Sequence, residues 1–135
     1  MDGPRVLIVE DEGALANLLA QALQNEGCEV ALSRDGIDCM NKVTGFAPDV
    51  IVMDIMMPRL DGIDTTRLIR RNPGYDNTVI VALSARTDPA TKQEMLAAGA
   101  DLFFDKPFVM SRLIGEIREA VASRAGFPWL RGRDR

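Results

Sequence analysis

The sequence is 135 residues long, the usual size of one compact domain, and 47% of it is hydrophobic, which is enough for a core. No apolar run approaches the length of a membrane span and no signal peptide begins the chain, so we expect a cytoplasmic protein without membrane contact. The chain contains no histidine. This excludes Ser-His-Asp catalysis, histidine-ligated zinc and a phosphohistidine of its own.

The formal net charge of −4 is unevenly distributed. Four arginines and one aspartate from Arg124 onward give +3, which leaves −7 for residues 1–123. An acidic body of this kind is not expected to bind nucleic acid directly. The two cysteines, Cys28 and Cys39, belong to no metal motif, and we interpret them as semi-buried thiols in a reducing compartment.

The first part of the chain alternates strand-like and helix-like segments. Residues 6–9 are continuously apolar, which is typical of a strand buried on both faces of a parallel sheet. The helix that follows has Gly27 beyond its end and carries an apolar stripe of Leu15, Leu18, Leu19, Ala22 and Leu23. Residues 28–32 include Glu29 and indicate an edge strand. The next helix is predicted to end at Gly45 and is marked by Ile37, Met40 and Val43.

The second part of the chain continues the alternation. Residues 50–53 and 79–83 are apolar runs that predict buried strands, and a helix over residues 63–71 lies between them. Asp88 is a good N-cap and Pro89 a good first residue for the fourth helix. A short strand follows at residues 102–104. The fifth helix is marked by the apolar residues Met110, Leu113, Ile114, Ile117 and Val121.

This order predicts an α/β fold with five parallel strands and five helices, which cover both faces of the sheet. Right-handed crossovers favour the doubly wound strand order 2-1-3-4-5. We assign residues 1–124 to one domain and residues 125–135 to a C-terminal tail or truncated linker. Phe127, Trp129 and Leu130 in that tail are interpreted as part of a frayed terminus, with a docking segment as the alternative.

Polar residues follow four of the predicted strands, and parallel strands bring their carboxyl ends to one edge of the sheet. The expected cluster there is Glu10, Asp11, Asp54, Ser84 and Lys106. Each residue alone would more often be a loop, cap or surface residue, but their coincidence on four strands favours a site. Three crowded carboxylates repel one another, and Mg²⁺ is the hard cation that fits best.

A carboxylate beside Mg²⁺ and a lysine is a competent nucleophile for phosphorus. We therefore expect Asp54 to form an acyl phosphate. Lys106, the Ser84 hydroxyl and the backbone N–H of Ala85 are the groups expected to stabilise the transferring oxygens.

Four segments, RVLIVED, DVIVMDIMMPRLDG, VIVALSA and GADLFFDKPF, resemble the motifs of CheY-like receiver domains of bacterial two-component response regulators. The resemblance covers about residues 5–124 and implies a flavodoxin-like fold with Asp54 as the phosphoacceptor. It implies further roles, which are Asp11 as direct Mg²⁺ ligand, Glu10 as indirect ligand, the Met56 carbonyl as backbone ligand, Lys106 as phosphate contact, Pro107 in a cis peptide, Ser84 as switch hydroxyl and Phe103 as switch aromatic.

The resemblance also implies partners. A histidine kinase or histidine phosphotransfer protein would phosphorylate Asp54, and the surface of the fourth helix, fifth strand and fifth helix would then signal to a downstream protein or form a homodimer. Position 103 is Phe where Tyr is frequent, and we expect this ring to turn inward more of the time. Leu102 and Glu116 stand where Asp and Arg are common in OmpR-type dimers, which weakens the case for that dimer.

Three alternatives stay open at this point. The chain can be the N-terminal receiver of a longer regulator with a DNA-binding or enzymatic output domain, but the 135 residues contain no such domain and we favour a stand-alone receiver or phosphorelay shuttle. It can also be a phosphate-blind interaction module, although the acidic set is complete. A phosphatase of the haloacid-dehalogenase type needs a second acid where Met56 stands, so we expect a signalling domain rather than an enzyme.

Overall fold

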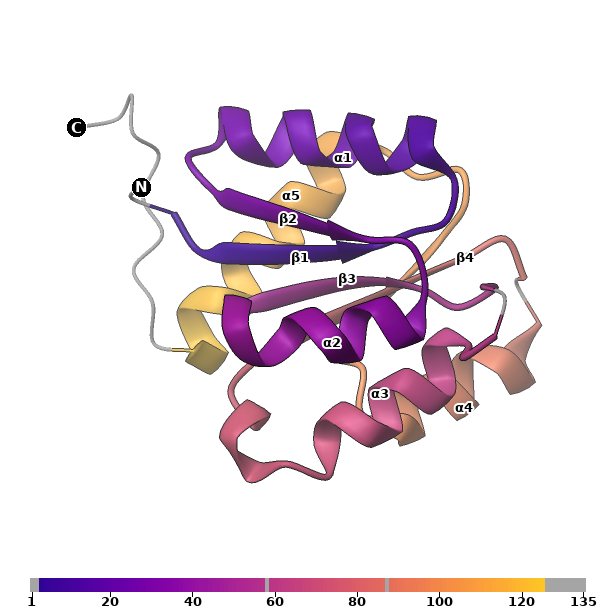
Figure 1. Ribbon diagram of the computed structural model, residues 1–135. Coiled ribbons are helices and arrows are strands. Elements are labelled where there is room, and N and C mark those ends of the chain that lie inside the picture. The colour runs from indigo at the N-terminus through magenta and orange to yellow at the C-terminus, as the bar shows by residue number, and fades with distance from the viewer. Residues whose placement is uncertain (1–2, 58, 87, 126–135) are drawn as a thin grey trace.

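The computed structural model describes residues 3–57, 59–86 and 88–125. Over these residues the chain forms one parallel sheet in the order β2-β1-β3-β4-β5 (Figure 1), as predicted. The strands are β1 (Arg5–Val9), β2 (Glu29–Ser33), β3 (Val50–Asp54), β4 (Val79–Ser84) and β5 (Leu102–Asp105). The helices are α1 (Gly13–Asn25), α2 (Gly36–Phe46), α3 (Gly62–Arg70), α4 (Pro89–Ala98) and α5 (Met110–Ala120), with a 3-10 helix η1 (Pro73–Tyr75) and a π-helical turn η2 (Val121–Ala125).

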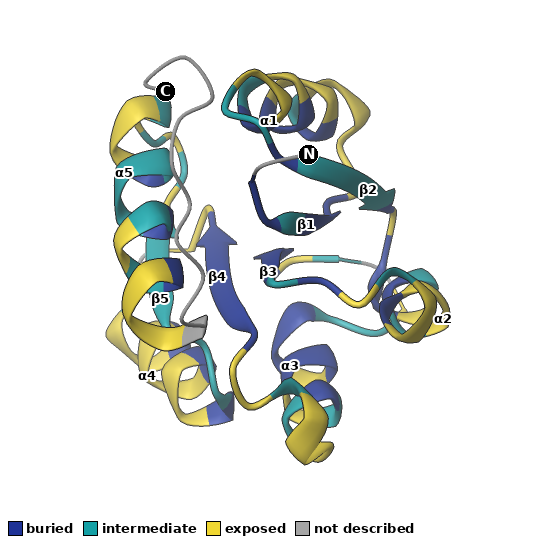
Figure 2. Cartoon of the chain, turned by 90° about the vertical axis from the view of Figure 1, so that its left-hand side faces the viewer, coloured by how far each residue is buried: buried dark blue, intermediate teal, exposed yellow. Residues whose placement is uncertain are grey.

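Helices cover both faces of the sheet because successive residues of a buried strand point to opposite sides. In β1, Val6 and Ile8 pack with residues of α1 and α5, whereas Leu7 and Val9 pack with residues of α2, α3 and α4. Figure 2 shows these two groups of helices on either side of the sheet, with their buried residues turned toward it. β3 and β4 are buried along their whole length, while the edge strand β2 is mostly half-buried.

Leu19 and Leu23 of α1 and Val43 of α2 are buried as predicted, but one residue of each predicted stripe is not. Leu18 and Ile37, both expected in buried stripes, are 57% and 44% exposed. Successive helical residues are turned by about 100°, so Leu18 points to solvent because its neighbour Leu19 points to the sheet. The residues that α1 buries are Ala16, Leu19, Ala20 and Leu23, and those that α2 buries are Gly36, Cys39 and Val43.

One predicted helix end is wrong and one is confirmed. α2 continues past Gly45 to Phe46, and its cap residue Ala47 adopts a left-handed conformation with φ of 52°. At the start of α4, the Asp88 side chain accepts a hydrogen bond of 3.0 Å from the backbone N–H of Thr91. Asp88 is therefore the N-cap that the sequence predicts.

The two cysteines are fully buried rather than semi-buried. Cys28 lies in the core on the α1 and α5 side of the sheet, and Cys39 lies in the core on the other side. Burial raises the pKa of each thiol to about 12, so both stay protonated at neutral pH. They are therefore part of the packing.

Two further expectations concern the limits of the domain. None of the helices in the described residues has the length and apolar character needed to cross a bilayer. The predicted tail, apart from residue 125, lies outside the described residues, so its role stays a prediction.

The loop that follows β3 turns back tightly over the end of the strand. The backbone N–H of Gly62 donates a 3.0 Å hydrogen bond to the carbonyl of Ile55. A Cβ atom on Gly62 would lie 2.8 Å from Ile55 Cα and closer still to the Asp54 carbonyl oxygen. The absence of a side chain at Gly62 thus allows α3 to begin directly against the residue that ends β3.

We predict that Gly62→Ala destabilises the fold by about 1–3 kcal/mol, because the atoms it would meet belong to the backbone and have little freedom to move. The matched control is Gly115→Ala in α5, where a Cβ has no neighbour within 4 Å. That substitution should stabilise the helix by about 0.5–1 kcal/mol. Urea unfolding of both variants measures the two changes, and equal effects would contradict the close packing at Gly62.

Candidate functional site

Four charged side chains predicted to meet do so at the carboxyl ends of the strands. Oxygen atoms of Glu10, Asp11 and Asp54 lie within 4.8 Å of one another. The Lys106 Nζ atom lies 2.9 Å from Glu10 Oε1 and 3.4 Å from Asp54 Oδ1. The expected juxtaposition is therefore confirmed.

Strand pairing explains why these residues meet. Val9 and Met53 are partners in the pairing of β1 with β3, so the next residues, Glu10 after β1 and Asp54 at the end of β3, lie at the same level of the sheet. The backbone N–H of Lys106 donates a 2.8 Å hydrogen bond to the Ser84 carbonyl, which extends the β4–β5 pairing by one residue. The peptide bond from Lys106 to Pro107 is cis, as the sequence resemblance implied.

The three carboxylates differ in their surroundings. Glu10 and Asp54 are 2% and 3% exposed, whereas Asp11 is exposed to solvent. Glu10 Oε2 accepts a 3.1 Å hydrogen bond from the Glu12 backbone N–H, and Asp54 Oδ1 accepts one of 3.3 Å from the Met56 backbone N–H. The buried pair is thus held in place, while Asp11 closes the cluster on the solvent side.

Burial perturbs the titration of this cluster. The pKa of Asp54 is raised from 3.8 to about 7, chiefly by burial and then by the Glu10 carboxylate, against the lowering effect of Lys106. For Lys106, burial is the largest influence and lowers the pKa, but Glu10 and Asp54 together raise it above its usual value of 10.5. The ammonium group therefore stays charged beside the two carboxylates.

The cluster has the composition that a hard divalent cation requires. With all three carboxylates ionised, Lys106 leaves two negative charges uncompensated, and the donors are all oxygen atoms. Mg²⁺ prefers such donors and is usually held by one or two carboxylates together with water. Glu10, Asp11 and Asp54 thus fit the ion that the sequence predicts. Met56 lies two residues after Asp54, and its carbonyl stays a predicted ligand.

Three further predicted site residues belong to β4, to the residue after it and to β5. Ser84 is fully buried at the end of β4, and its Oγ atom accepts a 2.9 Å hydrogen bond from the Arg86 backbone N–H. Ala85 follows it and is exposed. Phe103, in the middle of β5, is half-buried, and the Lys92 ammonium lies 5.9 Å from the centre of its ring.

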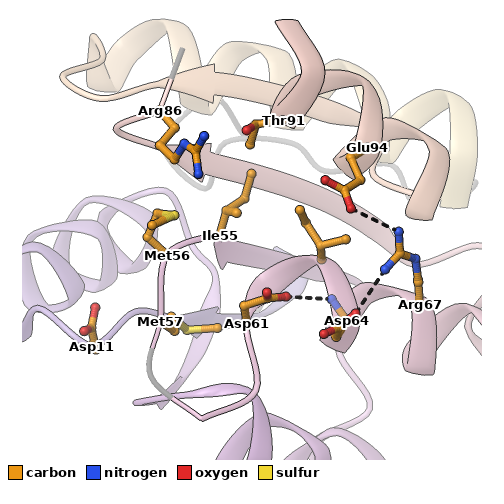
Figure 3. Close-up of a pocket in the computed structure, with 11 residues that line it drawn as sticks. Asp11, Ile55, Met56, Met57, Asp61, Asp64, Arg67, Arg86, Thr91 and Glu94 are labelled. Atoms are coloured by element: carbon orange, nitrogen blue, oxygen red, sulfur yellow. Dashed lines mark hydrogen bonds and ion pairs between the residues drawn. The ribbon is translucent and has the colours of Figure 1, made fainter. Parts of the chain in front are cut away.

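A hollow of about 620 Å³ adjoins the cluster between the loop after β3 and the start of α4 (Figure 3). Asp11, Met56 and Arg86 are among the residues that line it. On its far side, Arg67 of α3 contacts Asp64 at 3.0 Å and Glu94 of α4 at 3.6 Å. Of the three clustered carboxylates, Asp11 faces this hollow, whereas Glu10 and Asp54 are buried behind it.

Sequence reasoning missed one ion pair beside the site. Arg59, in the loop after β3, forms a salt bridge with Asp35, the N-cap of α2. The Asp-Gly sequence at positions 35 and 36 is a signal for a helix start, but no spacing rule connects it to an arginine 24 residues later.

The sequence matches the family described as response regulator receiver domain over residues 6–118. It is 34% identical to protein PilG of Pseudomonas aeruginosa, over 90% of each chain. It is 39% identical to the transcriptional regulatory protein TrcR of Mycobacterium tuberculosis over 84% of this chain, but it spans only 44% of TrcR.

Solved structures agree with these matches. The receiver domain of the Francisella response regulator 1452 superposes with a TM-score of 0.83 at 30% identity, over 90% of this chain and 98% of that one. The chemotaxis protein CheY4 of Vibrio cholerae superposes with a TM-score of 0.82 at 30% identity, over 87% and 98% of the two chains.

In the metal-free protein, we predict that Asp54→Asn removes a pH dependence of stability. Because the pKa of Asp54 is raised on folding, the stability that its protonated form contributes is complete below about pH 4 and is lost as pH rises through about 7. Above that pH the variant should be more stable than wild type by about 1–3 kcal/mol. Urea unfolding in EDTA across this range measures the difference, and parallel stability curves would contradict it.

Proposed function

Since this chain belongs to the response regulator receiver family, we propose that it accepts a phosphoryl group on Asp54 from a histidine kinase or histidine phosphotransfer protein. The observation that carries the proposal is the buried Asp54 carboxylate, which shares a cluster with Glu10 and Asp11 and lies 3.4 Å from the Lys106 ammonium. A nucleophile, a candidate metal site and a cation for phosphoryl oxygens are thus in one place.

The proposed reaction forms one bond and breaks another. An Asp54 carboxylate oxygen attacks the phosphorus while the bond from phosphorus to the donor's imidazole nitrogen breaks and its electron pair leaves with the imidazole. Glu10, Asp11 and Asp54, with the Met56 carbonyl, are the groups that would hold Mg²⁺, and the ion would supply charge that offsets the crowded anions. We propose that Lys106, whose Nζ atom lies 3.4 Å from Asp54 Oδ1, contacts a phosphoryl oxygen on Asp54, and that Ala85 donates its backbone N–H to another.

The signal is proposed to leave through the surface of α4, β5 and α5. The Ser84 hydroxyl would turn to donate a hydrogen bond to a new phosphoryl oxygen, because Ser84 is buried at the end of β4, the strand next to the one that Asp54 ends. Phe103 would follow in β5, and its inward preference stays a prediction. Glu116 lies 3.3 Å from Arg112 within α5, which gives this residue a partner other than an OmpR-type one.

The role proposed is signalling in the cytoplasm, with turnover limited to the chain's own phosphorylation and dephosphorylation. Met56 stands where a phosphatase of the haloacid-dehalogenase type needs its second acid. The downstream partner can be a separate protein or an output domain. TrcR and MprA of Mycobacterium sp., of which this chain spans 44% and 49%, are consistent with an output domain, whereas PilG, of which it spans 90%, is consistent with a separate partner.

Incubation with Mg²⁺ and a small acyl phosphate is expected to add a single phosphate, measured by intact mass, that hydroxylamine removes. Asp54→Ala should abolish this adduct because the proposal makes Asp54 the acceptor and assigns Glu10 and Asp11 to the metal. Glu119→Gln, which removes an exposed carboxylate on α5, should still be phosphorylated. An adduct that persists in Asp54→Ala would refute the proposed acceptor.

Millimolar Mg²⁺ is expected to raise the melting temperature, since only the folded chain gathers the three carboxylates. Asp11→Asn should lose most of this shift and yet melt like wild type without metal, because Asp11 is exposed. Glu119→Gln removes the same charge far from the cluster and should keep the shift. Equal Mg²⁺ shifts in the two variants would contradict a metal site at Asp11.

A further inference from the structure

The loop that follows Asp54 is fastened to the start of α2 by a contact across the sheet edge. Arg59 of this loop pairs with Asp35, whose carboxylate is almost fully buried and also accepts a 2.8 Å hydrogen bond from the Asp38 backbone N–H. Figure 1 shows that the end of β3 and the start of α2 lie at the same end of the sheet. The pair therefore connects the loop to a rigid helix end.

The same two segments are packed together beneath this ion pair. A Cβ atom on Gly36 would lie 2.5 Å from the Leu60 carbonyl oxygen and closer still to Thr65 Oγ1. Arg59 has a φ of 67°, the left-handed region that is unfavourable for residues with a Cβ atom. Such a conformation persists where the surroundings hold it in place. Asp35 and Gly36 provide these surroundings.

The loop held in this way carries groups of the proposed site. Met56 directly follows Ile55 on it, and the Met56 backbone N–H donates to Asp54 Oδ1 at 3.3 Å. Asp35, Arg59 and Asp11 also line a common hollow of about 560 Å³ beside the carboxylate cluster. A shift of the loop would therefore move the Met56 backbone relative to Asp11 and Asp54.

We propose that Arg59 is a positioning residue, whose ion pair with Asp35 fixes the loop after β3 and thereby strengthens Mg²⁺ binding at Glu10, Asp11 and Asp54. The inference rests on the proposed function, because it assigns Arg59 a role in the same site. The positioning role and simple electrostatics predict opposite effects of removing the Arg59 charge on Mg²⁺ affinity. Coulomb attraction alone would let the loss of a nearby cation tighten Mg²⁺ binding, whereas positioning requires that the loss of Arg59 weaken it.

The test is the Mg²⁺ dissociation constant measured by titration calorimetry on the full chain, together with melting curves in EDTA. Arg59→Ala is expected to bind Mg²⁺ about tenfold more weakly, the lower end of the loss typical of outer-shell partners. The matched control is Arg34→Ala, since Arg34 lines the same hollow but belongs to the loop before α2. This control should bind Mg²⁺ as tightly as wild type or more tightly.

A second variant tests the other side of the ion pair. Asp35→Asn keeps a good N-cap for α2 but loses the ion pair, and it should weaken Mg²⁺ binding more than Asp38→Asn, which removes a carboxylate from the same hollow. In the double variant, Arg59→Ala should add little to the effect of Asp35→Asn. If Arg59→Ala fails to fold, the comparison of Asp35→Asn with Asp38→Asn carries the test.

The outcomes separate the two proposals. If the wild-type chain binds no Mg²⁺ and accepts no phosphate, the proposed function fails. If wild type does both and Arg59→Ala binds Mg²⁺ equally well or better, the positioning role alone is overturned. The phosphorylation rate is a second criterion. Arg59→Ala should be phosphorylated more slowly than wild type at low Mg²⁺ and at the wild-type rate when Mg²⁺ is saturating.

Discussion

Two buried carboxylates share one ammonium group at the carboxyl edge of the sheet. The resulting excess of negative charge explains much of the site. Glu10 and Asp54 are nearly inaccessible to water, and Lys106 contacts both of them. Charges in such a place repel one another strongly unless a partner compensates them. The folded chain holds these carboxylates together although they repel one another. The same excess of negative charge makes the cluster suited to a divalent cation.

The sequence was informative wherever the topology itself decides the outcome. Apolar runs predict the buried strands. Parallel strands with right-handed crossovers are then enough to predict that Asp11, Asp54 and Lys106 meet at one edge of the sheet. Helix rotation was predicted less well. The predicted stripe of α1 contained both Leu18 and Leu19, but packing against the sheet buries Leu19 and leaves Leu18 exposed.

Loops were the least predictable part of the site. The ion pair between Arg59 and Asp35 joins two connections whose paths no periodic pattern specifies, and the left-handed conformation falls on an arginine rather than a glycine. Such contacts depend on the finished packing of α2 against the end of β3. They are also the contacts that adjust a site whose main residues are set by topology, which is why we assign a positioning role to Arg59.

The central claim is that the gathered carboxylates bind a divalent cation next to Asp54. Diffraction from crystals grown with Mn²⁺, a Mg²⁺ substitute with a measurable anomalous signal, tests it most directly. We expect one strong anomalous peak in contact with carboxylate oxygens of Asp11 and Asp54 and adjacent to Glu10. Ordered Mn²⁺ found only at other surface carboxylates, with the cluster bridged by Lys106 alone, would contradict the account.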